Sequence, residues 1–145
     1  SLVSSCDFLK TKFVGKKTNH NKNNIIKTLK LYLNSPYLWG GRTNYGIDCS
    51  GFSQIIYKIQ NIKIKRDANQ QALQGDIVKR KDCNMGDLAF FGDSKKKITH
   101  VGILLSTSEI IHAYGKIRID KINDKGIINS ETKKNTHKLI EIRTY

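Results

Sequence analysis

The apolar residues of this chain change their spacing near its middle. Between residues 24 and 33 they recur every three or four positions, and a second stretch with this helical period runs from Cys49 to Ile59. Beyond residue 86 they occur in short runs that alternate with polar residues, a pattern typical of β-strands. Helices followed by a series of strands predict an α+β domain with its helices packed on an antiparallel sheet.

Local signals give the expected boundaries of these elements. Asn24 is expected to cap the first helix and Pro36 to end it, while the second helix is expected to begin near Cys49. A short polar helix is expected from 67 to 74, ended by Gly75. The expected strands are 88–91, 98–105, 109–114, 117–120 and 139–142, with a charged loop at 92–97 and the last strand closing the sheet.

A chain of 145 residues is expected to form one domain. We assign residues 1–23 to a polar lead-in and residues 24–145 to the folded domain. Within the lead-in, Val3 to Cys6 has the form of a lipoprotein cleavage box, which would make Cys6 an acylated residue. An upstream domain that has been removed explains the lead-in equally well. No apolar run approaches the ~20 residues needed to cross a bilayer, so no stable membrane span is expected.

The formal net charge of +14 favours contact with a polyanion, such as nucleic acid, anionic lipid or a cell-wall polymer. The lysines are scattered, however, and no basic strip is interleaved with aromatic residues as in single-strand binders. We therefore expect no nucleic-acid partner. The protein is expected to be a monomer.

Three cysteines, at positions 6, 49 and 83, cannot all pair internally, and no CxxC is present, which indicates free thiols. Cys83 lies in a polar turn without a basic partner of its own and is interpreted as a bystander. Cys49 precedes a helix, where unpaired N–H groups and the helix dipole favour the reactive thiolate. An inert buried thiol is the alternative interpretation of Cys49.

His100 and His112 are candidate bases for Cys49. Their separation of 12 positions suits two adjacent antiparallel strands joined by a turn at 106–108, with both imidazoles on one face. One ring would take the thiol proton, and the other would accept a hydrogen bond from its second nitrogen. A metal site that also includes Cys83 is the alternative, but the intervals match no zinc clip. We therefore expect no metal and no cofactor.

At this point the chain resembles the NlpC/P60 cysteine peptidases of bacterial cell-wall metabolism. The resemblance is carried by blocks in the family's order and spacing, which together run from about residue 25 to 119: Pro36–Gly41, Gly46–Phe52, Arg66–Asp67 with Gln70–Gln71, Gly86–Phe91, His100–Ile103 and Ile110–Ala113. It implies a papain-like fold and hydrolysis of peptidoglycan stem peptides. Family members typically cut between D-γ-glutamate and a diamino acid such as meso-diaminopimelate.

The resemblance also implies catalytic roles. Cys49 matches the nucleophile, His100 the base and His112 the third polar member of the triad. Tyr37 matches a tyrosine whose hydroxyl lies near the thiol, where it would help to bind the oxyanion together with the Cys49 N–H group.

Three further residues are implied in substrate binding. Asp48 and Ser50 match positions that line the pocket, and in members that take a free N-terminal L-Ala the aspartate meets the amine. Trp39 is interpreted as a cleft wall or as plain core. A departure from the family is Ala68, which stands where a hydroxyl residue is frequent.

Several alternatives stay open. The same thiol chemistry would serve an acyltransferase or amidase, and the fold would also serve a non-catalytic wall-binding module. Residues 1–23 are too few for the SH3-like domain that restricts some members to free N-termini, so restricted and open endopeptidases are both possible. The expected compartment is the cell envelope, or the cytoplasm if the substrate is a recycled muropeptide.

Overall fold

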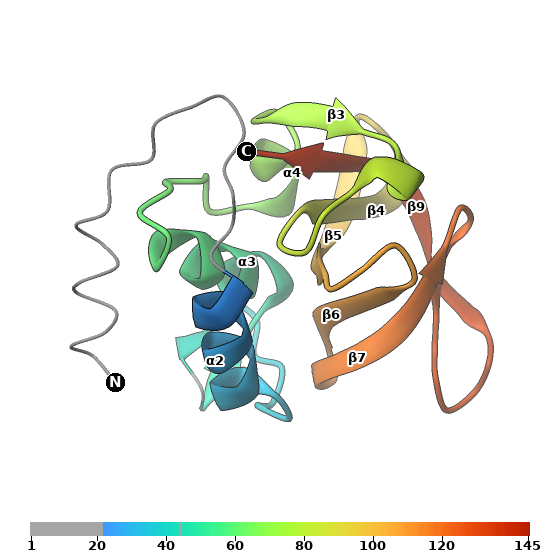
Figure 1. Ribbon diagram of the computed structural model, residues 1–145. Helices are drawn as coiled ribbons and strands as arrows, with labels where there is room; N and C mark the ends of the chain where they lie inside the picture. Colours follow the sequence, from blue (N-terminus) through green and yellow to red (C-terminus); the bar gives the residue numbers. More distant parts are fainter. Residues whose placement is uncertain (1–21, 44) are drawn as a thin grey trace.

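The computed structural model describes residues 22–43 and 45–145, and shows helices packed beside a curved antiparallel sheet (Figure 1). The expected lead-in and the lipoprotein box at Cys6 lie almost wholly outside these residues. The helices are α2 (Lys22–Tyr32), α3 (Cys49–Lys58), α4 (Ala68–Gln71) and the 3₁₀ turn η1 (Arg80–Asp82). The strands are β1 (Arg42–Thr43), β2 (Gly46–Ile47), β3 (Asp76–Val78), β4 (Leu88–Ser94), β5 (Lys97–Leu104), β6 (Glu109–Tyr114), β7 (Lys116–Asn123), β8 (Gly126–Ile128) and β9 (Asn135–Thr144).

Seven strands form one antiparallel sheet in the order β3-β9-β4-β5-β6-β7-β8. Because β8 also pairs with β9, six of these strands close on themselves and only β3 lies outside the closed part. The C-terminal strand therefore closes the sheet, as its alternating pattern predicts. Closure removes free edges, which are otherwise sites of unwanted pairing.

Strand alternation divides the core into two clusters. Leu88 and Phe90 of β4 face the helices, whereas Ala89 and Phe91 face the interior of the closed sheet. The helix-facing cluster takes in α2 and α3, and its members include Ile25, Phe52 and Ile56, all of which are almost fully buried. One face of α3 is thus held firmly against the sheet.

Helix α3 begins where the sequence predicts. Asp48 is its N-cap, with extended backbone angles and a carboxylate oxygen that accepts the Gly51 N–H at 2.7 Å. A side chain at Gly51 would collide with this carboxylate and with the Gly41 carbonyl, so glycine is required there. The helix packs on β5 and β6, which puts its first residue beside the sheet.

The prediction for the first helix is wrong at both ends. The helix already includes Lys22, so Asn24 lies within it and does not cap it. It ends at Tyr32, four residues before Pro36, because Asn34 takes a left-handed conformation with φ of 67°. Short-range capping signals misplaced both boundaries.

The strand predictions are correct in number and order for the central strands but too short for most of them. The expected loop at 92–97 is mostly strand, since β4 continues to Ser94 and β5 begins at Lys97. The short strands β3 and β8 were not predicted. The expected short helix is confirmed only for Ala68–Gln71, with Asp67 as its N-cap.

No helix among residues 22–43 and 45–145 is both long and apolar enough to span a membrane.

Candidate active site

The thiol of Cys49 lies at the junction of α3 and β5. The residue is buried, with 9% of its surface exposed, and is the first residue of the helix. Backbone N–H groups of Val101, Ser50 and Cys49 itself donate towards its sulfur. The thiol thus lies beside the strand position that follows His100.

The register of β5 explains why Val101 has an N–H group available for the thiol. The pairing of β5 with β6 runs from Leu104 back to Gly102, which lies opposite His112, and goes no further along β5. Val101 pairs with Phe90 on the other side. The strands β5 and β6 therefore part beyond Gly102, and the start of α3 lies against β5 at this point.

Burial has the largest effect on the Cys49 pKa. It raises the pKa of the thiol above the ordinary value, and the nearby Asp48 carboxylate raises it further. The N–H groups of Val101, Ser50 and Cys49 lower it, as the helix-start position predicts, but they do not outweigh burial. The helix start therefore favours the thiolate without producing it, and the thiol needs a base to ionise it.

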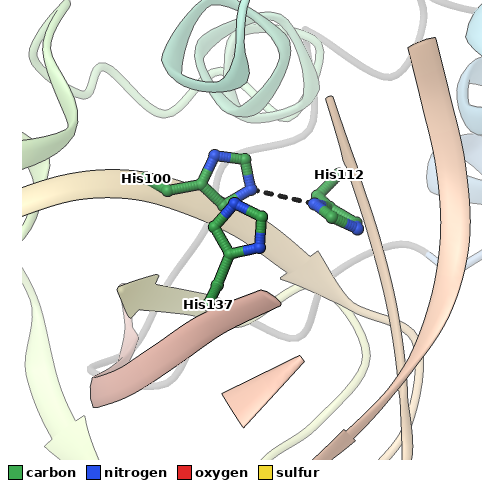
Figure 2. A group of neighbouring side chains, drawn as sticks. All are labelled: His100, His112 and His137. Carbon is green, nitrogen blue, oxygen red and sulfur yellow. Dashed lines mark hydrogen bonds between the residues drawn. The ribbon is translucent and has the colours of Figure 1, made fainter. Parts of the chain in front are cut away.

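The two expected histidines lie together. Nε2 of His100 is 2.9 Å from Nδ1 of His112, and the two rings meet nearly at right angles (Figure 2). They come from adjacent antiparallel strands and share one face, as their spacing predicts. Gly102 makes this contact possible, because a side chain there would collide with His112 and Ile110.

His100 is held in its neutral form. Burial lowers its pKa well below the usual value, and the neighbouring His112 and His137 lower it further. A neutral imidazole has one bare nitrogen that can accept a proton. His100 is therefore suited to act as a base for an un-ionised thiol.

Asp120 extends the histidine pair, and it was not identified from the sequence. Its Oδ2 is 2.8 Å from Nε2 of His112, and the carboxylate is 1% exposed. Burial alone would raise the pKa of Asp120, but the bonds from His112, Ser130 and Arg118 lower it far below its usual value. The alternation of 117–120 puts Asp120 on the polar side with Arg118, so the local pattern gave no signal that this carboxylate is buried.

His137 is the second residue that the sequence analysis did not identify. It lies on β9, its ring stacks on that of His100 with centroids 4.2 Å apart, and it is edge-on to His112 (Figure 2). Burial lowers the pKa of His137 to about 4, helped by His112 and opposed by Asp120. The ring covers the histidine pair in its uncharged form.

The three imidazoles do not form a preorganised metal site. One nitrogen from each lies within 4.8 Å of the others, close enough to suggest one. A metal ion, however, lies in the ring plane of each histidine that binds it. The rings of His100 and His137 are stacked with only 26° between their planes, so their lone pairs do not converge on a single ion.

On the helix side, Asp48 forms an ion pair with Arg66. Nη2 of Arg66 is 2.8 Å from Oδ2 of Asp48, and its Nη1 donates to Asp48 and to Ser50. Asp48 also accepts the Gly40 and Gly51 N–H groups. Burial would raise its pKa, but Arg66 and these N–H groups outweigh burial and lower it. The use of Asp48 to bind a substrate amine stays a prediction, and Arg66 was not among the expected site residues.

A cleft of about 530 Å³ opens beside the thiol, lined by residues that include Trp39, Asp48, Cys49, Ser50, Arg66 and Asp67. Trp39 is 85% exposed, so the interpretation of this residue as plain core is wrong. Tyr37 is partly exposed, and burial raises its pKa, as do the Cys49 and Asp48 side chains. The roles of Trp39, Ser50 and Tyr37 towards a substrate stay predictions.

The model of the NlpC/P60 family matches residues 34–136 of this chain. The chain is 35% identical, over 111 residues, to a γ-D-glutamyl-L-lysine dipeptidyl-peptidase of Bacillus cereus, covering 73% of this chain and 33% of the relative. It is 42% identical, over 91 residues, to the Bacillus subtilis protein of the same name, covering 61% of this chain and 31% of that one.

Among solved structures, the chain is similar to an NlpC/P60 family protein from Bacillus cereus, with a TM-score of 0.70 and 30% sequence identity. The match covers 85% of this chain and 39% of that one. The two curated relatives extend well beyond the matched part, since the chain spans about a third of their length. The α+β fold with its large antiparallel sheet agrees with the matched structure.

Proposed function

The chain belongs to the NlpC/P60 family, and from this premise we propose that it is a cysteine peptidase that hydrolyses peptidoglycan stem peptides. The observation that carries the proposal is the bond between His100 and His112 on the strands against which the start of α3 packs. Cys49 lies at that helix start, with the Val101 N–H directed at its sulfur. The arrangement supplies a nucleophile, a base and a group that orients the base.

The reaction starts with both partners neutral. His100 accepts the thiol proton as sulfur attacks the scissile carbonyl, so charge separates only when the new bond forms. The carbonyl oxygen becomes an oxyanion, for which the Cys49 N–H and the Tyr37 hydroxyl are the available donors. Protonated His100 then gives its proton to the leaving amine, and the C–N bond breaks to leave a thioester on Cys49.

The second half of the reaction regenerates the thiol. His100 takes a proton from water, whose oxygen attacks the thioester. The C–S bond breaks, the acyl group leaves as a carboxylic acid, and His100 returns the proton to Cys49. The lowered pKa of His100 favours this sequence, because each proton that His100 accepts is passed on within the same half-reaction.

The substrate bond that we propose is the amide between γ-D-glutamate and a diamino acid. Two relatives are named for a γ-D-glutamyl-L-lysine bond, while meso-diaminopimelate is the diamino acid that the family pattern suggests. A cleft with Arg66 and two aspartates in its lining suits a peptide that carries both carboxylates and amines. The cell envelope, where peptidoglycan lies, is the compartment that we propose.

Digestion of defined muropeptides tests this function. Purified protein is incubated with L-Ala-γ-D-Glu-L-Lys and L-Ala-γ-D-Glu-meso-diaminopimelate stems, free and glycan-linked, and the products are identified by mass spectrometry. We expect L-Ala-D-Glu to be released by the wild type and not by Cys49→Ala. Transfer of the acyl group to an added amine in preference to water would indicate an acyltransferase. Binding to peptidoglycan without cleavage would indicate a wall-binding module.

A further inference from the structure

Asp120 has the surroundings of an ionised acceptor in a dry site. Besides Nε2 of His112, its oxygens accept from Nε and Nη2 of Arg118, at 2.8 and 3.2 Å, and from the Ser130 N–H at 2.9 Å. The Ser130 turn is itself fixed by Asn129, whose side-chain oxygen accepts the backbone N–H groups of Glu131 and Thr132. Such a carboxylate keeps both its charge and its orientation.

An ionised carboxylate can only accept hydrogen bonds. The nitrogen of His112 that faces Asp120 must therefore carry a proton, and this nitrogen is Nε2. In neutral His112 the other nitrogen, Nδ1, is then bare and can only accept. Its partner is Nε2 of His100, so that nitrogen must carry the proton of their shared bond.

The chain of bonds ends at the second nitrogen of His100. With the proton of His100 on Nε2, its Nδ1 is bare, and in Figure 2 this nitrogen lies on the side of the neighbouring helix. A general base for Cys49 needs such a bare nitrogen on the side of the helix that begins at this residue. If His112 bonded instead through a proton on Nδ1, neutral His100 would carry its proton on Nδ1 and could not accept another there.

We propose that Asp120 is a positioning residue that selects the tautomers of His112 and His100, and so keeps Nδ1 of His100 free to accept the Cys49 proton. The effect passes through two hydrogen bonds and involves no contact with substrate. The proposal rests on the proposed function for its kinetic consequence, whereas the tautomers themselves are measurable without any substrate.

Asp120→Asn is the informative substitution. The amide keeps the size of the side chain but can donate, so it can bond to a bare Nε2 of His112 and reverse both tautomers. Glu131→Gln is the matched control, because Glu131 is an exposed carboxylate 3.7 Å from Nη2 of the same Arg118 and lies outside the histidine chain. Both substitutions remove one negative charge next to Arg118.

Ring-nitrogen NMR on ¹⁵N-histidine-labelled full chain reports the tautomers directly. We expect protonated Nε2 on both His112 and His100 in the wild type and in Glu131→Gln, and protonated Nδ1 on both in Asp120→Asn. A wild-type spectrum with a bare Nε2 on His112 overturns the proposal. This measurement on the wild type stands even if Asp120→Asn does not fold.

Alkylation of Cys49 by iodoacetamide, followed across pH by peptide mapping, gives a second substrate-free test. In Asp120→Asn we expect slow alkylation at neutral pH that recovers towards the wild-type rate at high pH, where the thiol ionises without a base. A purely structural role would lower the rate at all pH values, or leave the profile unchanged. Either result overturns the proposal. The titratable and charged groups that face the histidine pair are Asp120, His137 and Tyr114, and Arg118 faces Asp120.

Hydrolysis of the stem peptide gives the kinetic consequence. For Asp120→Asn we expect kcat to fall by about 10²–10⁴-fold with KM changed by less than about threefold, and both constants to stay near wild type in Glu131→Gln. Unchanged kcat in folded Asp120→Asn overturns the proposal while leaving the peptidase function intact. If the wild type cleaves no stem peptide, the proposed function fails, and the tautomer spectra still decide the role of Asp120.

Discussion

The site has a helix half and a sheet half, which differ in how they control charge. The residues of the helix half are Asp48, Cys49, Ser50 and Arg66. Those of the sheet half are His100, His112, Asp120 and His137. In the helix half, charged groups line an open cleft, and the Asp48 carboxylate is fixed by backbone N–H groups and by an Arg66 side chain that is 30% exposed. In the sheet half, His112 is fully buried and each group is fixed mainly by its neighbours.

This difference separates two tasks. Burial raises the pKa of Cys49 and lowers that of His100, so both start uncharged and the proton moves only during the reaction. In the mechanism that we propose, the helix half presents the nucleophile and shapes the cleft, while the sheet half controls where the proton goes. Substitutions in the sheet half should therefore change kcat, and those at the helix cap should change mainly stability or substrate preference.

The largest expected effect comes from the two residues that join the halves. Cys49→Ala and His100→Ala should each lower kcat by about 10⁴-fold or more, because losing either member of a cooperating pair removes most of the rate. Steady-state hydrolysis of a stem peptide measures it. Cys83→Ala is the control, since Cys83 lies in the other core cluster and should leave kcat unchanged. Turnover by folded His100→Ala close to that of the wild type would contradict the role of His100 as the base for Cys49.

A graded effect is expected at His112. His112→Asn should be milder than His112→Ala, because an amide oxygen can still accept the Nε2–H of His100. We expect a loss of about tenfold for Asn and about 10²–10³-fold for Ala in kcat, within the range for general-base catalysis. Circular dichroism confirms that both variants fold. Full activity in folded His112→Ala would remove His112 from the catalytic group.

Asp48→Asn tests whether the helix half reads the substrate. If Asp48 is a cap and an Arg66 partner, the variant should lose about 1–2 kcal/mol of unfolding free energy, and both free-amine and N-acetylated stems should be affected alike. If the carboxylate meets a substrate ammonium, preference for the free amine should fall by about ten- to a hundredfold. The four hydrogen-bond donors on Asp48 favour the first outcome. The ratio of kcat/KM for the two substrates distinguishes them.

The smallest expected effect concerns His137 and pH. An unfolded histidine binds a proton near pH 6.5, whereas folded His137 does so only near its pKa of about 4. Between these pH values the unfolded state binds more protons than the folded state. The contribution of neutral His137 to the free energy of unfolding should therefore be complete above about pH 6.5 and should decline as the pH falls towards 4. His137→Gln should make this decline less steep. Part of the decline should remain, because the pKa of buried His100 is lowered too and contributes in the same direction. Denaturant unfolding at pH 4.5, 5.5 and 7 measures it, and an unchanged slope would contradict the assignment.

Local patterns in the sequence were sufficient to place the helix start at Cys49 and to bring His100 and His112 together. The helix start at Cys49 follows from the capping Asp48, and the pairing of His100 with His112 follows from two strands and a short turn. Asp120 and His137 are brought in by pairings beyond the hairpin, β7 on β6 and β9 on β8, and nothing in local spacing specifies them. The Arg66–Asp48 pair joins positions 18 residues apart and is equally non-local.

The effects of burial on the pKa of Cys49 and on the exposure of Trp39 could not be predicted from the sequence either. The N–H groups around Cys49 lower its pKa, as its position at a helix start predicts, but the larger effect of burial depends on how α3 packs on the sheet. Similarly, Trp39 is as apolar as a core residue, yet its loop leaves it at the cleft. In both cases tertiary packing, and not local chemistry, decides the outcome.

The most direct test of the central claim compares Cys49 and Cys83 in one molecule. Both are 9% exposed and burial raises the pKa of both, but only Cys49 lies at the start of α3, which packs on the strands that carry His100 and His112. With iodoacetamide at near-neutral pH and peptide mapping, we predict faster modification of Cys49 than of Cys83 or Cys6, and loss of this advantage in His100→Gln. Equal or slower labelling of Cys49 in the wild type, or an advantage that survives His100→Gln, would contradict the claim that His100 activates this thiol.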